Sequence, residues 1–157
     1  RKVCGDAVMK LKIEKGKLIS FFVRVKGPGG VRELRAVLDT GSQRCTISPV
    51  DARDLGYDCF FDPLANKGDG DLALMQSGIM EVGPLVIEEI NVGDLRVANI
   101  EALAYELPKM SGVNMVLGLN FIENFKTSIN FDEGYIIIEH MKTEDVENVE
   151  NMEITKV

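Results

Sequence analysis

Residues 34–45 read LRAVLDTGSQRC, and this stretch decides the fold. The apolar run before Asp39 has the composition of a buried strand, yet Asp39 carries a charge at neutral pH. Burying an unpaired carboxylate costs roughly several kcal/mol, so the charge needs partners or a chemical task. Asp39 is therefore either a turn residue that bonds the local backbone or a residue that takes part in chemistry.

The composition is that of an ordinary globular protein. With 157 residues, of which 45% are hydrophobic and 27% charged, the sequence predicts one domain with a substantial core. No stretch approaches the roughly 20 apolar residues of a membrane-spanning helix. A net charge of -7 argues against a nucleic-acid partner, because phosphate binding needs clustered Lys and Arg.

The cysteine and histidine pattern predicts neither disulfides nor a metal site. Cys4, Cys45 and Cys59 are odd in number and form no CxxC pair, so we expect free thiols in a reducing, cytoplasmic compartment. Cys45 is interpreted as a small buried apolar residue, and the lone His140 as a surface residue at a strand end. The GDGD stretch at 68–71 begins like a calcium loop but lacks the later acidic ligand. We therefore expect no metal and no other cofactor.

Alternating apolar and polar residues over 9–25 predict two strands joined by a tight turn at Lys15-Gly16-Lys17. The glycine-rich stretch 27–30 predicts a second turn, which leads into a strand over 31–38. Its glycines open a strand rather than a helix, which argues against a phosphate-binding loop. These segments form the first half of an all-β domain.

Short helices interrupt the predicted strands. Ser48 as the N-cap, Pro49 at the first helical position and Gly56 after the end predict one to two helical turns. Residues 84–105 predict two strands with a hairpin turn at Gly93-Asp94.

The last third of the chain continues this pattern. Residues 114–125, NMVLGLNFIENF, predict a strand that passes through Gly118 into a short helix. Residues 128–139, SINFDEGYIIIE, predict a hairpin. The expected organisation is one all-β domain over 1–140 and an acidic C-terminal tail over 141–157.

Two motifs together are similar to those of a known family. Asp39-Thr40-Gly41-Ser42 and Val116-Leu117-Gly118, each following an apolar strand, resemble the two signatures of the retropepsin-like aspartic proteases. This family includes the single-domain retroviral proteases and the half-domains of pepsin. The resemblance covers roughly residues 10–139 and implies the retropepsin-like acid-protease fold with two short helices.

The resemblance also implies a mechanism. Two aspartates about 3 Å apart share one proton, and they activate a water that hydrolyses the peptide bond. Because the sequence contains one D-T-G, the resemblance implies a two-fold symmetric homodimer in which each chain supplies Asp39. Thr40 is then expected to bond across the axis. Gly41 offers its N–H, and Ser42 bonds the outer carboxylate oxygen, which favours the ionised form and more acidic activity.

The implied substrate is an extended peptide segment covered by a flap from each chain. The best candidate for the flap contains Gln76, Ser77 and Gly78, and the loop over 67–70 is the competitor. Two other functions stay open at this point. One is a non-catalytic dimeric peptide-binding or interaction module. The other is a self-processing domain of a longer precursor, because the sequence begins with Arg1 rather than Met.

Overall fold

A computed structural model of the chain describes residues 7–58, 71–75, 78–107 and 112–141. Strands predominate in these ranges, and two short helices interrupt them, which confirms the predicted all-β class. In chain order the elements are β1 (Val8–Lys12), β2 (Ser20–Gly27), β3 (Gly30–Leu38), β4 (Cys45–Ile47), α1 (Pro49–Asp54), β5 (Asp71–Met75), β6 (Gly78–Val92), β7 (Leu95–Ala104), β8 (Met115–Leu117), α2 (Leu119–Ile122), β9 (Phe125–Asn130) and β10 (Tyr135–His140).

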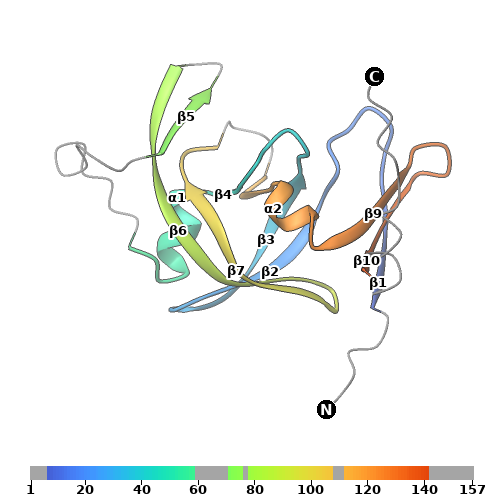
Figure 1. Cartoon of the computed structure of the whole chain (residues 1–157), viewed down its shortest axis with the longest axis horizontal. Coiled ribbons are helices and arrows are strands. Elements are labelled where there is room, and N and C mark those ends of the chain that lie inside the picture. Colours follow the sequence, from blue (N-terminus) through green and yellow to red (C-terminus); the bar gives the residue numbers. More distant parts are fainter. Residues whose placement is uncertain (1–6, 59–70, 76–77, 108–111, 142–157) are drawn as a thin grey trace, which may run out of the picture.

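The larger sheet closes on itself. Its strand order is β2-β3-β8-β4-β7-β6-β5, and β2 also pairs with β6 from Arg24↔Asn91 to Lys26↔Glu89. The six strands β2, β3, β8, β4, β7 and β6 therefore form a ring, and β5 pairs with β6 outside this ring (Figure 1). Two parallel pairings, β3 with β8 and β4 with β7, lie within this ring. Closure leaves few free strand edges around the core.

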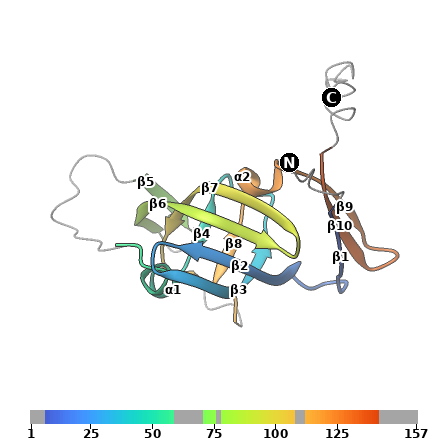
Figure 2. The same cartoon turned by 90° about the horizontal axis from the view of Figure 1, so that it is seen from below.

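A second sheet of three strands, in the order β1-β10-β9, stands at one side of the barrel in both views (Figures 1 and 2). The predicted hairpin over residues 9–25 is therefore wrong in its pairing. β1 pairs with β10, from Val8↔Glu139 to Lys12↔Tyr135, whereas β2 pairs with β3. The turn at Gly16 exists and has a φ of +74°. However, Ile13, just before it, donates its N–H to the Gly134 carbonyl in the turn between β9 and β10, so the turn at Gly16 connects the two sheets instead of two paired strands.

The other predicted turns and the first helix are confirmed. β2 and β3 meet at Gly27↔Gly30, and β6 and β7 meet around Gly93. At the start of α1, Ser48 Oγ accepts the N–H of Asp51, and Gly56 follows the helix with a φ of +87°. A positive φ of this kind favours glycine, so the local sequence explains where this helix ends.

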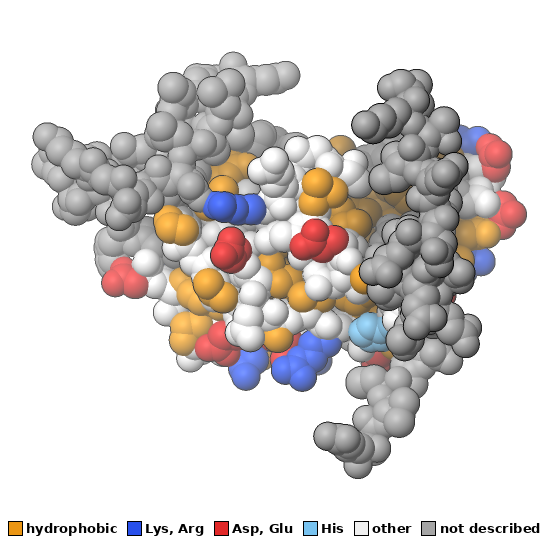
Figure 3. Space-filling model, viewed as in Figure 1, with side chains coloured by type: hydrophobic (Ala, Val, Ile, Leu, Met, Phe, Trp, Pro, Cys, Tyr) orange, Lys and Arg blue, Asp and Glu red, His pale blue; other side chains and the backbone are white. Residues whose placement is uncertain are grey.

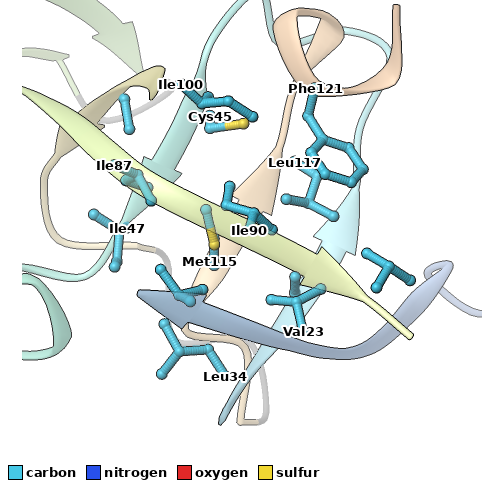
Figure 4. Close-up of a cluster of buried hydrophobic side chains, with 14 of the residues drawn as sticks. Val23, Leu34, Cys45, Ile47, Ile87, Ile90, Ile100, Met115, Leu117 and Phe121 are labelled. Carbon is cyan, nitrogen blue, oxygen red and sulfur yellow. The ribbon is translucent and has the colours of Figure 1, made fainter. Parts of the chain in front are cut away.

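One apolar core joins the two sheets. The labelled side chains from the barrel strands and α2 converge in Figure 4, and Ile47, Ile90, Met115 and Leu117 are fully or almost fully buried. Ile136 and Ile138 of β10 belong to the same cluster, so the smaller sheet packs on the barrel rather than standing apart. On the outer face in Figure 3, apolar side chains are interspersed with acidic and basic ones. Among the described residues, the helices are too short to span a bilayer.

Candidate active site

The site lies where two parallel strands end at the same level. β3 and β8 pair in register from Ala36↔Met115 to Leu38↔Leu117. One further hydrogen bond, from Asp39 N–H to the Leu117 carbonyl at 3.0 Å, extends this ladder. Asp39 and Gly118 are consequently the next residues after two equivalent strand ends, one on each strand.

The loop after β3 surrounds the carboxylate of Asp39 with donors. Gly41 N–H donates to Oδ1 at 2.8 Å, and the Ser42 hydroxyl donates to Oδ2 at 2.9 Å. Hydrogen bonds to a charged acceptor are stronger than those between neutral groups, so they fix the orientation of the carboxylate. Asp39 and Thr40 are nevertheless exposed in the single chain. The carboxylate is thus held in place while remaining accessible.

Residues after β8 hold this loop from behind. Leu119 N–H donates to the Ser42 carbonyl at 2.8 Å, and Asn120 N–H donates to the Gln43 carbonyl at 3.2 Å. Gly118 is buried, and a Cβ at this position would lie 2.8 Å from the Ser42 carbonyl oxygen. It would also lie 2.5 Å from the carbonyl oxygen of Arg44. A side chain at position 118 is therefore incompatible with the observed backbone.

Sequence reasoning missed Asn120. Its Oδ1 accepts the N–H of Cys45 at 2.9 Å, and its Nδ2 donates to the Glu101 carbonyl at 2.7 Å. The side chain therefore links the start of β4 to β7 and supports the loop that carries Asp39. The available signal was an amide side chain two residues after Gly118, in the first turn of a short helix.

Cys45 is confirmed as a small buried residue, with 0% of its surface exposed. Burial raises the pKa of its thiol to about 11, and a hydrogen bond from the Gly118 backbone offsets this only in part. A thiol with this pKa stays protonated near neutral pH and is a poor nucleophile. Although it lies near Asp39 in sequence, the geometry assigns Cys45 to packing.

The predicted site residues fall into two groups. Asp39, Thr40, Gly41 and Ser42 lie in the one loop just described. In the predicted flap, Gly78 begins β6 and pairs with Met75 at the end of β5.

Gln76 and Ser77, together with the competing loop over 67–70, lie outside the described residues, so the flap stays a prediction. Within the described residues, no group of three His, Cys, Asp or Glu side chains is arranged to hold a metal ion.

The closed barrel and the carboxylate loop define a protein of the acid-protease type, and comparison with known proteins agrees. The profile of the family described as aspartyl protease matches residues 23–121. This match spans more than half of the sequence, and the chain belongs to that family. A search of curated proteins found no match.

A solved structure, a retropepsin-like aspartic protease from Rickettsia conorii, has the same fold with a TM-score of 0.62. It is 18% identical, and the alignment covers 86% of this chain and 92% of that one. The retropepsin-like fold expected from the two motifs is thereby confirmed.

Proposed function

We propose that the protein is an aspartic endopeptidase that acts as a homodimer, with Asp39 from each chain forming the catalytic pair. The observation that carries this proposal is the contrast between the two strand ends. One bears an accessible, oriented carboxylate, and the other bears Gly118, where no side chain fits. The second carboxylate must then come from a second copy of the chain.

The chemistry follows from the proximity of two carboxyl groups. Two like charges about 3 Å apart cannot both persist, so the pair shares one proton. The ionised carboxylate accepts a proton from a water, which attacks the peptide carbonyl carbon. The protonated carboxyl donates to the carbonyl oxygen, and a proton passes to the amine nitrogen when the C–N bond breaks. Gly41 and Ser42 hold the carboxylate in position during these transfers.

The substrate class is an extended segment of polypeptide. A peptide bound as a strand presents alternate side chains to the protein and satisfies its backbone groups through main-chain hydrogen bonds. The segment between β5 and β6, with Gln76, Ser77 and Gly78, is the proposed flap over it. Closing such a segment excludes water from the reaction.

Cleavage of a diverse peptide pool between pH 3 and 7 tests the proposal. The Asp39→Asn protein removes the ionisable group with little change in shape, and we expect activity to fall by about a thousandfold or more. Asp132→Asn is the matched control, because the Asp132 side chain is fully exposed in a distant turn. Its activity should equal that of the wild type.

Two results would reject the proposed function. Equal cleavage by wild type and Asp39→Asn would exclude Asp39 as the catalytic group. A wild-type protein shown to be a folded dimer, but without activity on any peptide, would instead favour a peptide-binding module.

A further inference from the structure

The three-stranded sheet has two unlike faces. Met9 and Leu11 of β1 pack against the core cluster, and Ile136 and Ile138 of β10 are buried in it. Because successive side chains of a strand lie on opposite faces, the side chains between these residues lie on an outer face. The sheet stands beside the barrel in Figure 2, so this outer face is directed away from the barrel.

Basic residues lie on both edge strands of this outer face. Lys10 and Lys12 of β1 and Lys126 of β9 are exposed there, and we call these three lysines the basic face. Among the paired residues of the outer face, Glu139 is the one acidic residue, and its carboxylate lies 3.6 Å from Lys126 Nζ. Three lysines against one glutamate leave the outer face positive, although the whole chain has a net charge of -7.

Apolar groups lie between these lysines. Ile137 pairs with Lys10, and Tyr135 pairs with Lys12. The Lys10 ammonium lies 3.9 Å from the centre of the Tyr135 ring. Val8, at the start of β1, is 52% exposed. A surface that mixes cations with apolar groups fits a segment in which acidic and apolar residues alternate.

The segment that follows β10 has this composition. Residues 142–157, which lie outside the described residues, read KTEDVENVENMEITKV, and we call them the acidic segment. Its acidic residues are Glu144, Asp145, Glu147, Glu150 and Glu153. The apolar residues between them are Val146, Val149 and Met152. Its basic residues are Lys142 and Lys156, so the segment is negative overall.

The acidic segment begins beside the basic face. Glu139, near the end of β10, pairs with Val8 on one side and with Lys126 on the other. Lys12, the most distant lysine, lies opposite Tyr135, which is four residues earlier along β10 and about 13 Å away. Sixteen residues of extended chain span about 50 Å, so the segment is long enough to turn back over the whole outer face.

Covalent attachment makes such a contact favourable where free association is weak. A single exposed ion pair shifts an equilibrium by about fivefold at most. The acidic segment is joined to the sheet by the chain, however, so its effective concentration at the outer face is about millimolar, and several pairs can form together. Apolar side chains that cover Val8 and Ile137 add to these pairs.

We propose that the acidic segment binds the outer face of the three-stranded sheet of its own chain. Its carboxylates pair with the basic face, and its apolar side chains lie over Val8 and Ile137. This contact stabilises β1, an edge strand whose one strand partner in the described sheets is β10. The inference is independent of the proposed function, because it uses no residue of the Asp39 site.

Carbodiimide cross-linking of the unaltered chain tests this contact. The reagent joins a lysine amine to a carboxylate that lies against it, and mass spectrometry of the digest identifies the pair. At low salt, we expect links from the basic face to the acidic segment within single chains, and about fivefold fewer in 1 M salt. Lys26 is the control, because its Nζ lies 3.7 Å from Glu88 on the barrel. It should be joined to Glu88 and not to the acidic segment.

Three cross-linking results would overturn the inference. The first is the absence of links between the basic face and the acidic segment while the Lys26–Glu88 link forms. The second is equal linking of the acidic segment to Lys26 and to the basic face, which would show random collision. The third is links found only between two chains, at twice the mass, because the occupant would then be the segment of a second copy.

A glutamate-specific protease measures the contact through variants. Lys10→Gln/Lys12→Gln removes two exposed charges, and we expect cleavage within the acidic segment to be about three- to tenfold faster, because the protease cuts the released segment. Arg24→Gln/Lys26→Gln is the matched control, since it removes two exposed charges from alternate positions of β2. Its cleavage rate should equal that of the wild type. Equal rates for wild type and Lys10→Gln/Lys12→Gln would overturn the inference.

Discussion

The loop after β3 and the turn after β8 occupy equivalent places and have opposite properties. Both follow strands paired in register, at Leu38↔Leu117. The first exposes a carboxylate whose two oxygens each accept a hydrogen bond, whereas the second is buried and has a glycine at the corresponding position. Steric exclusion explains why the second segment has a glycine, because the backbone of the first loop occupies the position that a side chain on residue 118 would need.

The two segments have different roles: the one after β3 presents the carboxylate, and the one after β8 supports it. The unit at Gly118 supports the unit at Asp39 through backbone hydrogen bonds to Ser42 and Gln43. A close-fitting support cannot also carry a catalytic side chain. Under the proposed function, each chain supplies one aspartate, and a complete site needs a second copy.

The largest expected effect comes from breaking the supporting unit. Gly118→Ala places a Cβ 2.5 Å from a carbonyl oxygen of the other loop, which has to move. We expect a loss of about 3 kcal/mol in the free energy of unfolding, measured by urea denaturation. Peptide cleavage should fall with it, because Ser42 and Asp39 shift together.

Gly112→Ala is the control for this substitution. Gly112 has a φ of +74°, and a Cβ there would meet no atom within 4 Å. It should cost about 1 kcal/mol from backbone conformation alone. If both variants lost the same stability, close packing at Gly118 would not be what distinguishes the two strand ends.

A second prediction concerns the buried thiol of Cys45, which follows the Asp39 loop and contacts the Gly118 backbone. The pKa of Cys45 is raised to about 11 from an ordinary value of 9.0. Between these values the unfolded chain releases the proton and the folded chain retains it, so stability falls as pH rises from about 9 to 11. The loss attributable to Cys45 should be about 2 kcal/mol.

Comparison of wild type with Cys45→Ala isolates this contribution. Denaturation at several pH values from 8 to 11 should give a steeper loss of stability for the wild type. Parallel curves would mean that the thiol is not buried against Gly118 as the structure shows.

The smallest predicted effect sharpens the role of the exposed unit. Ser42→Ala removes the donor to Asp39 Oδ2 but leaves Gly41 in place. We expect kcat/KM to fall about tenfold, or ~1.4 kcal/mol, because the carboxylate loses one of the two hydrogen bonds that orient it. Ser128→Ala, at an exposed position on β9, should have no effect. An unchanged kcat/KM for Ser42→Ala would show that the Ser42 hydroxyl does not contribute to the site.

Local signals in the sequence predicted most elements because each depends on a few neighbouring residues. Ser48, Pro49 and Gly56 define α1, and the turn at Gly93 defines the hairpin of β6 and β7. The partner of β1 was not predictable in this way. Alternation identifies which face of a strand is buried, but it does not identify the strand with which it pairs.

The candidate site shows the same limit. The D-T-G motif and the distant Val116-Leu117-Gly118 motif together predicted that Asp39 belongs to the site. Asn120 joins Cys45 to Glu101 across segments that are distant in sequence, and only the folded structure brings those backbone groups together.

The central claim, that two copies of Asp39 form one site, is tested most directly with a mixed dimer. Wild-type and Asp39→Asn chains carrying different affinity tags would be co-expressed, and the dimer that bears both tags isolated and assayed at once. The account predicts that this mixed dimer is as inactive as the Asp39→Asn homodimer, since one carboxylate is not enough. Half of the wild-type activity would show that each chain holds a complete site, and would contradict the account.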